Sequence, residues 1–160
     1  MTIKVGDKIP SVTVKTMGKD GPQNLSTDDL FKGKKVALFA LPGAFTPTCS
    51  AKHLPGYVKN ADTLKSKGIN SIVCMSVNDA FVMNAWGKDQ NVGDKVVMAA
   101  DGNGDLAKAL GLELDARGHG MGSRSKRFSM IVDDGVVKTL NVEAPGAFEV
   151  SSAEHMLKQL

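Results

Sequence analysis

The run Lys35–Leu41 is the feature that most limits which folds this chain can adopt. After Lys35 every residue in the run is apolar, and Pro42-Gly43 follows directly. A short, unbroken apolar run with a turn signal at its end is typical of a central strand that is covered on both faces. Helices on both sides of a sheet provide that cover, so the run predicts an α/β protein.

Helical and strand patterns alternate around this run. The longest predicted helix follows Cys49, with a bend near Pro55-Gly56 and an end at about Lys67, before Gly68. The other predicted elements are, in chain order, a short strand within residues 4–15, a turn at 20–22, a helix from Ser26 or Thr27 to Phe31, a strand at 69–77, a helix at 79–89, a strand at 96–99, a helix capped by Asn103 that closes at Gly111, an irregular glycine-containing loop at 112–125, a hairpin of 128–132 and 136–142, and a final helix capped by Ser151 or Ser152.

This order of elements predicts the fold class. Strand–helix–strand alternation followed by a hairpin and a helix is the thioredoxin-like order, in which helices flank both faces of a mixed central β-sheet. No linker, repeat or low-complexity tract divides the 160 residues. We therefore predict one thioredoxin-like domain over residues 1–160, long enough to bury a substantial core.

Composition argues against several classes of function. The net charge is only +3, and a single Trp and a single Tyr provide no aromatic series on which bases could stack, so no nucleic-acid partner is predicted. No apolar stretch approaches membrane-spanning length, and the first ten residues lack a signal-peptide pattern, so no membrane association is expected. Two cysteines do not make a disulfide framework, which favours a reducing compartment, and we predict the cytoplasm.

The segment Pro42-Gly43-Ala44-Phe45-Thr46-Pro47-Thr48-Cys49 places one cysteine at the first turn of a helix. Unpaired backbone N–H groups and the helix dipole at that position both favour a thiolate, which is the nucleophilic form of cysteine. Thr46 adds a hydroxyl that can donate to the sulfur or to an oxygen that the sulfur attacks. Pro42 and Pro47 remove two N–H groups and restrict the backbone. The segment predicts an activated cysteine in a preformed pocket.

Four blocks of sequence together resemble one family. The runs PGAFTPTCS, KHLPGY, SVNDAFVMNAW and SRSKRFSMIVDDGVVK resemble the peroxiredoxin 5 (type II, atypical) subfamily of thiol peroxidases, in the same order and over nearly the whole chain. The resemblance implies a thiol-dependent peroxidase for hydrogen peroxide and organic hydroperoxides, with no metal or cofactor. It matches Cys49 to the peroxidatic cysteine, which becomes a sulfenic acid, Thr46 to the residue that hydrogen-bonds the peroxide, Pro42 to the residue that shields the pocket, and Arg127 to the arginine that completes the site.

The side-chain type of Arg127 also suggests a role at the site, independently of the family resemblance. A guanidinium is always charged and presents a rigid fork of donors, so near Cys49 it would stabilise the thiolate and the leaving oxygen. Strand alternation puts Phe128 and Met130 on one face and Arg127 on the other. The pattern alone leaves open that Arg127 is simply exposed to solvent.

Two further residues allow more than one interpretation. His53 lies one helical turn after Cys49 and could be a general base or half of a metal pair, but a structural role is favoured, and we leave it out of the catalytic set. Cys74 lies in a predicted buried strand, where a free cysteine commonly packs as a small hydrophobe. Its alternative role is that of a resolving thiol, which would need a close approach to Cys49.

Residues 148–152 contain no resolving cysteine, unlike some members of the family. The resemblance therefore suggests reduction by an external thiol, with glutathione and glutaredoxin favoured and thioredoxin as the alternative. It also favours a homodimer built on the loops around the site, to which Phe45 could contribute. The competing function is a redox sensor or thioredoxin-interacting protein that uses the same cysteine through a Cys49–Cys74 disulfide.

Overall fold

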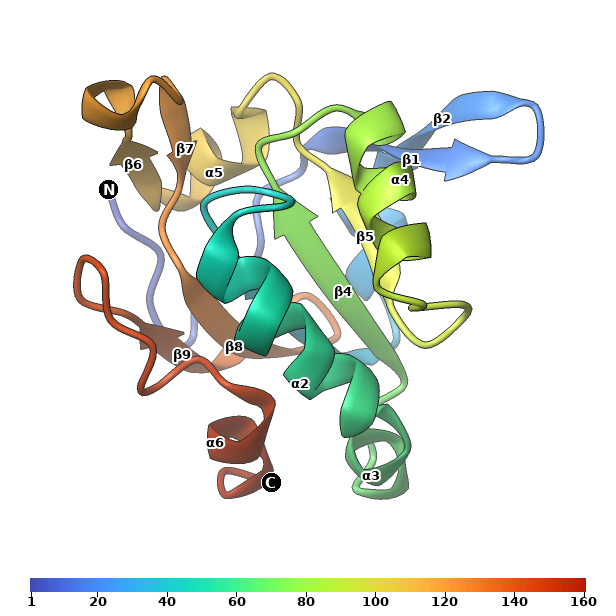
Figure 1. Cartoon of the computed structure of the whole chain (residues 1–160). Helices are drawn as coiled ribbons and strands as arrows, with labels where there is room; N and C mark the ends of the chain where they lie inside the picture. Colours follow the sequence, from blue (N-terminus) through green and yellow to red (C-terminus); the bar gives the residue numbers. More distant parts are fainter.

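A computed structural model describes all 160 residues, and its centre is a seven-stranded sheet (Figure 1). The strand order is β2-β1-β5-β4-β3-β8-β9, with β3, β4 and β5 parallel and the other neighbouring pairs antiparallel. The strands are β1 (Thr13–Gly18), β2 (Gly21–Ser26), β3 (Lys35–Ala40), β4 (Ser71–Ser76), β5 (Val97–Ala100), β8 (Phe128–Asp133) and β9 (Val136–Val142), while β6 (Glu113–Asp115) and β7 (Ser123–Ser125) form a separate pair. The apolar run that begins at Lys35 forms β3, which lies between β4 and β8.

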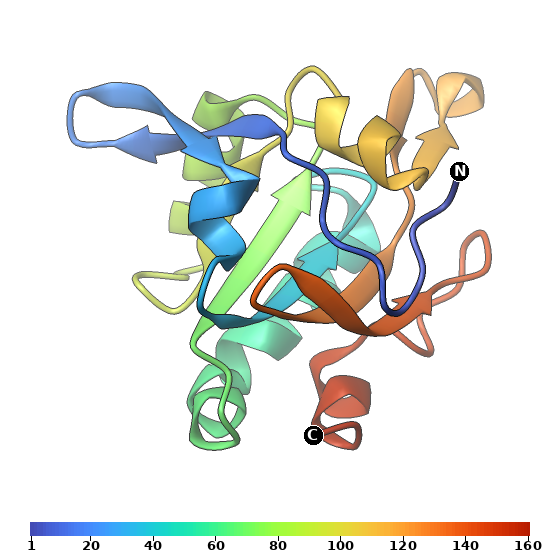
Figure 2. The same cartoon turned by 180° about the vertical axis from the view of Figure 1, so that it is seen from behind.

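Helices cover both faces of the sheet, as predicted. They are α1 (Thr27–Phe31), a π-helical turn (Cys49–His53), α2 (Leu54–Lys59), α3 (Ala61–Ser66), α4 (Ala80–Asp89), α5 (Asp105–Leu110), a short 3₁₀ turn (Arg117–His119) and α6 (Ala153–Leu157). The cluster of buried side chains on one face includes residues of α2, α3, α4 and α6, and the cluster on the opposite face includes residues of α1 and α5 (Figures 1 and 2). This is the thioredoxin-like arrangement.

The alternation along β3 divides its side chains between these two clusters. Phe39 packs with the first cluster, which also holds Cys49, while Leu38 and Ala40 pack with the second. Phe39 stacks on Tyr57 of α2, with ring centroids 3.9 Å apart and an interplanar angle of 3°. The contact fixes the helix that follows Cys49 against the central strand.

The structure corrects four details of the sequence prediction. The single long helix predicted to run to about Lys67 is divided at Asn60 into α2 and α3. Residues 21–26 form a second strand after the predicted turn, although this exposed edge strand lacks an apolar pattern. Residues 112–125 contain the β6–β7 pair instead of only loop. The N-terminal N–H groups of α5 are satisfied by the Asp101 carboxylate, not by Asn103.

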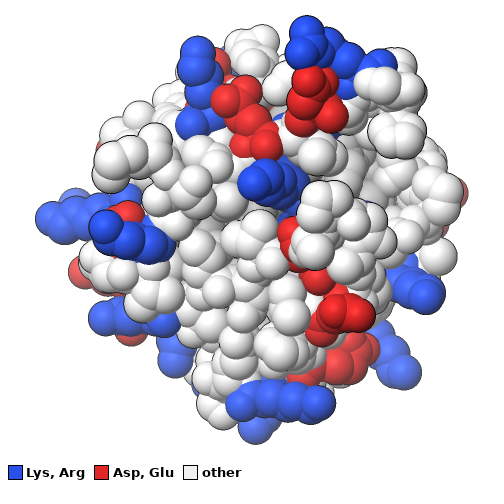
Figure 3. All heavy atoms as spheres, turned by 90° about the vertical axis from the view of Figure 1, so that its left-hand side faces the viewer, with Lys and Arg blue, Asp and Glu red and all other residues white.

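No helix is both long and apolar enough to cross a membrane. Figure 3 views the side of the molecule on which the β6–β7 pair lies, and there acidic and basic side chains are interspersed around uncharged areas. On this face they form no continuous basic stripe of the kind that tracks a nucleic-acid backbone.

Candidate active site

Cys49 lies in the first turns of the helix that follows β3. The helix begins at Pro47, and the turn from Cys49 to His53 is π-helical, with the N–H of Leu54 donating to the Cys49 carbonyl. A proline ring clashes with the carbonyl four residues earlier in a regular α-helix, so the wider turn accommodates Pro55. Cys49 is completely buried, on the sheet face that carries α2 and α4.

Arg127 reaches Cys49 from a distant part of the chain. Its Nη2 atom lies 3.1 Å from the Cys49 Sγ atom, close enough for a charge-assisted hydrogen bond to a thiolate. Arg127 directly precedes β8, where Phe128 and Met130 pack into the opposite core cluster. The alternation that the sequence indicated therefore directs Arg127 toward Cys49, and the exposed alternative is wrong, since the side chain is half-buried.

His53 holds the other nitrogen of the same guanidinium. Arg127 Nη1 lies 2.8 Å from His53 Nδ1, and His53 Nε2 lies 3.0 Å from the Ser151 carbonyl oxygen. A guanidinium only donates, so Nδ1 accepts and the imidazole proton is on Nε2, which donates to Ser151. Burial, reinforced by the nearby Arg127 charge, lowers the pKa of His53 from 6.5 to about 3, so the ring is neutral at physiological pH.

Thr46 does not make the contact that the sequence suggested. Its hydroxyl donates to the Gly43 carbonyl at 2.7 Å rather than to Cys49. The same loop is held from outside by Asn78, whose Oδ1 atom accepts from the Ala44 N–H at 2.9 Å. The loop between β3 and the helix therefore has a fixed shape before any substrate binds.

Pro42 and Phe45 lie in this loop in different settings. The Pro42 carbonyl accepts from Arg124 Nη1 at 3.3 Å, and the same guanidinium nitrogen lies 2.7 Å from where a Cβ on Gly43 would be. Phe45 has a φ of 62° and a side chain that is 54% exposed. A left-handed conformation is strained for an aromatic residue, which marks the loop as constrained by its surroundings.

Cys74 is buried in β4, beside Phe39 of β3, and belongs to the same core cluster as Cys49. Burial, followed by the proximity of Cys49, raises the pKa of the Cys74 thiol well above its ordinary value. Both cysteines are free thiols in this structure. Cys74 therefore packs as a neutral, apolar group in the reduced protein.

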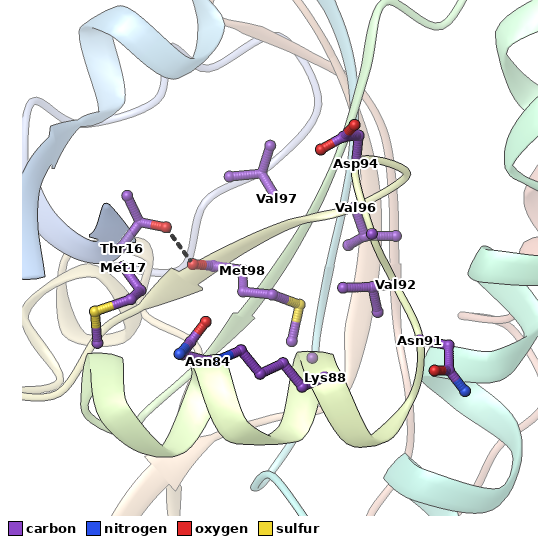
Figure 4. Close-up of a pocket in the computed structure, with 12 residues that line it drawn as sticks. Thr16, Met17, Asn84, Lys88, Asn91, Val92, Asp94, Val96, Val97 and Met98 are labelled. Carbon is purple, nitrogen blue, oxygen red and sulfur yellow. Dashed lines mark hydrogen bonds between the residues drawn. The ribbon is translucent and has the colours of Figure 1, made fainter. Parts of the chain in front are cut away.

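A cleft of about 430 Å³ lies in front of Arg127. Its walls include Pro42, Thr48, Lys126, Arg127 and Glu143, but Cys49 itself does not reach the cleft. A second groove, of about 630 Å³, lies between α4 and the strands β1 and β5, and Figure 4 shows the side chains that line it. No cysteine or histidine lines that groove, whereas the smaller cleft lies at Arg127, which contacts Cys49, so the smaller cleft marks the candidate site.

The residue types give no support to a metal centre, because no three His, Cys, Asp or Glu side chains come together in the structure. Sequence analysis did not identify Asn78 or Glu143, which hold the Ala44 N–H and residues 149–151, and it favoured only a structural role for His53. No local spacing could have identified Asn78 or Glu143, since both act across the tertiary structure.

Comparisons with known proteins identify the family of this chain. The Redoxin family profile matches residues 4–157. Peroxiredoxin-2E, chloroplastic, of Arabidopsis thaliana is 52% identical over 163 residues, covering 99% of this chain and 70% of that protein. The crystal structure of reduced Prx3 in complex with H₂O₂ from Vibrio vulnificus is 54% identical with a TM-score of 0.95, covering 99% of each chain. Peroxiredoxin 5 from Alvinella pompejana is 36% identical with a TM-score of 0.87, covering 98% of this chain and 96% of that one.

A thioredoxin-like fold that presents a guanidinium to a helix-terminal cysteine defines the class, a thiol-dependent peroxidase. The chain belongs to the Redoxin family, and within it to the peroxiredoxins of the type II and peroxiredoxin 5 kind.

Proposed function

We propose that Cys49 is the peroxidatic cysteine of this thiol-dependent peroxidase and that Arg127 stabilises its thiolate. The observation that carries the proposal is the distance of 3.1 Å between Arg127 Nη2 and Cys49 Sγ. A guanidinium at that distance favours the anionic sulfur without needing a general base. His53 is not that base, since its Nδ1 atom already accepts from Arg127.

The reaction follows from these positions. The Cys49 thiolate attacks one oxygen of a hydroperoxide, the S–O bond forms as the O–O bond breaks, and sulfur is oxidised to a sulfenic acid. The second oxygen leaves as hydroxide or alkoxide and takes a proton from solvent. Arg127 lies where that negative charge develops. The Vibrio vulnificus relative was solved in complex with H₂O₂, which supports hydrogen peroxide as one substrate.

Thr46 and Pro42 complete the proposed peroxide site. Because the Thr46 hydroxyl proton is engaged by the Gly43 carbonyl, the lone pairs of its oxygen are free to accept from the peroxide O–H. Pro42 forms part of the cleft wall and has no N–H that would need water. Since Cys49 is buried, the peroxide reaches Sγ only after the side chains between the cleft and the sulfur shift.

The cleft also suits the proposed reductant. Reaction of the sulfenic acid with an external thiol releases water and leaves a mixed disulfide, which a second thiol then reduces. A volume of about 430 Å³ is within the range of small-molecule sites, and the exposed Lys126 beside Arg127 favours a thiol that carries carboxylates. This supports glutathione with glutaredoxin, and thioredoxin remains the alternative.

Lys126 offers a direct test of the glutathione proposal. Lys126→Gln should slow glutathione-supported turnover several-fold while the peroxide reaction of Cys49 keeps its rate, because the Lys126 side chain makes no hydrogen bond to Cys49 or Arg127. Equal turnover by the two proteins at subsaturating glutathione would contradict a carboxylate-bearing reductant in this cleft.

Cys74 provides the second candidate chemistry, an intramolecular disulfide with Cys49. Both thiols belong to one buried cluster, which is the observation in its favour. Intact-mass analysis after one equivalent of peroxide plus glutathione separates the two. A gain of one glutathione on Cys49 supports the external reductant, whereas a loss of two hydrogens supports the disulfide and the sensor function.

Two further parts of the proposal concern assembly and location. Phe45 is 54% exposed, which is unusual for a large apolar side chain and supports a homodimer to which the loop around the site contributes. Sedimentation of the reduced protein tests this, and Phe45→Glu should dissociate the dimer. We propose a cytoplasmic location, although the Arabidopsis relative is described as chloroplastic, and cell fractionation decides between them.

Stopped-flow measurement of peroxide reduction tests the central proposal. Cys49→Ser should abolish turnover, and Arg127→Ala should lower the second-order rate constant by at least 100-fold, the usual size of such electrostatic effects. Arg117→Ala is the matched control, since that arginine is 80% exposed and contacts only Asp115. Near-normal turnover by Cys49→Ser would refute the assignment.

A further inference from the structure

Arg127 is held at both its backbone and its guanidinium by one connected set of hydrogen bonds. The Glu143 N–H donates to the Arg127 carbonyl at 3.0 Å, where β9 ends beside the start of β8. The guanidinium is held by His53 Nδ1 at 2.8 Å, and His53 in turn donates to the Ser151 carbonyl. Glu143 and Ser151 are hydrogen-bonded to each other. The hydrogen bonds therefore form a closed ring that runs from Arg127 through His53, Ser151 and Glu143 back to Arg127.

The Glu143 carboxylate makes that last connection. It accepts from the N–H groups of Glu149, Val150 and Ser151 and from the Ser151 hydroxyl, at 2.7–3.0 Å. The side chain is only 8% exposed. Burial alone would raise the pKa of Glu143, but these donors hold it below its ordinary value, so the group stays ionised.

We propose that Glu143 is a positioning residue, which fixes Arg127 against Cys49 by gathering residues 149–151 into the shape that holds His53. Both carboxylate oxygens of Glu143 accept hydrogen bonds from residues 149–151, so we assign this group a positioning role and no part in the chemical step. Its effect passes through Ser151, whose carbonyl accepts from both His53 and Tyr57. This inference rests on the role proposed above for Arg127.

The aromatic ring of Phe148 adds to the same contact. Its centroid lies 5.7 Å from Arg127 Cζ and 5.2 Å from the His53 ring. Phe148 belongs to the segment that Glu143 holds, so loss of the carboxylate would release both a hydrogen-bonded and an aromatic neighbour of Arg127. A misplacement of about 1 Å at a reacting centre costs on the order of 100-fold in rate.

A double-mutant cycle tests the proposal on the full-length reduced protein. Glu143→Gln replaces an acceptor oxygen by a donor that faces other donors, and it should lower the rate constant for hydrogen peroxide by about 10- to 100-fold. In an Arg127→Ala background the same substitution should change the rate by less than about twofold, because Glu143 acts only through Arg127. Glu149→Gln is the matched control, because that exposed side chain makes no contact in the set, and it should keep the wild-type rate.

A second measurement separates positioning from general loosening of the fold. General loosening of the fold would expose the buried Cys49 and speed its alkylation by iodoacetamide, whereas displacement of Arg127 alone would weaken the support of the thiolate, so a folded Glu143→Gln should be alkylated no faster than the wild type. A folded Glu143→Gln with the wild-type peroxide rate overturns the proposal. The proposal also fails if Glu143→Gln lowers the rate constant by the same factor in the wild-type and Arg127→Ala backgrounds. If Glu143→Gln does not fold, Ser151→Ala carries the same cycle with an expected loss of about threefold, and an unchanged rate there overturns it. Should Arg127→Ala itself keep full activity, the role of Arg127 fails instead.

Discussion

Acid should destabilise the folded protein through His53. The ring is neutral when folded because its pKa falls from 6.5 to about 3, mainly by burial and then by Arg127. Between these values the unfolded chain binds a proton that the folded protein does not, so the free energy of unfolding decreases as the pH falls below 6.5. Above that pH the contribution is complete.

The size of the effect follows from the two values. At pH 5, about 1.5 pH units below the unfolded pKa of 6.5, the loss is about 2 kcal/mol, at about 1.4 kcal/mol per unit. Glu143 also has a lowered pKa, so its contribution to stability starts to be lost only as the pH falls below 4.5, the ordinary pKa of a glutamate. The interval from pH 8 to pH 5 therefore isolates His53 from that carboxylate.

Urea unfolding followed by the fluorescence of Trp86 measures this quantity. The reduced wild type should lose about 2 kcal/mol more between pH 8 and pH 5 than His53→Gln, which keeps a donor and an acceptor but does not titrate. The other two histidines, His119 and His155, are present in both proteins, so their contribution cancels in the comparison. Equal pH dependence in the two proteins would show that His53 accepts a proton readily in the folded state, and the neutral-imidazole argument would be wrong.

Three further outcomes are expected. Asn78→Ala leaves the half-buried N–H of Ala44 without its acceptor, which should cost about 1–3 kcal/mol in urea unfolding and slow the peroxide reaction, and unchanged values of both would show that this hydrogen bond does not hold the loop. Cys74→Ala should keep glutathione-supported turnover within about twofold, because a residue that only packs contributes no chemistry; loss of turnover would instead assign it a resolving role. Oxidation of Cys49 should change the Trp86 emission, since the indole N–H donates to Ser50 at 3.0 Å, and an unchanged spectrum would mean that this helix turn does not move.

The local part of the site could be predicted from sequence, and the part that assembles it could not. The segment from Pro42 to Cys49 specifies a strand end, a tight loop and a helix start, and alternation around Phe128 gave the face on which Arg127 lies. The contact with Cys49 depends on the register of β3 and β8, which pairs Ala40 with Phe128 and so brings Arg127 beside the loop that follows β3. Nothing in the local pattern fixes that register between strands about 90 residues apart.

Two other features were not predicted for the same reason, because they depend on contacts between distant parts of the chain. Residues 21–26 pair only with β1 at the edge of the sheet, so their side chains need no apolar pattern to be stable there. Glu143 is one ordinary carboxylate after a strand in the sequence. It acquires its partners only when residues 149–151 fold back over it, and no periodicity or spacing reports such a contact.

The arrangement of charges explains why a neutral ring, rather than a carboxylate, holds Arg127. A carboxylate on Nη1 would bind the guanidinium tightly but would offset the positive charge that a thiolate needs nearby. His53 fixes the same nitrogen as a neutral acceptor and leaves that charge directed at Cys49. The negative charge of Glu143 is placed one step further away, where backbone N–H groups and the Ser151 hydroxyl satisfy it. The carboxylate thus contributes order to the site without competing with Cys49 for the guanidinium.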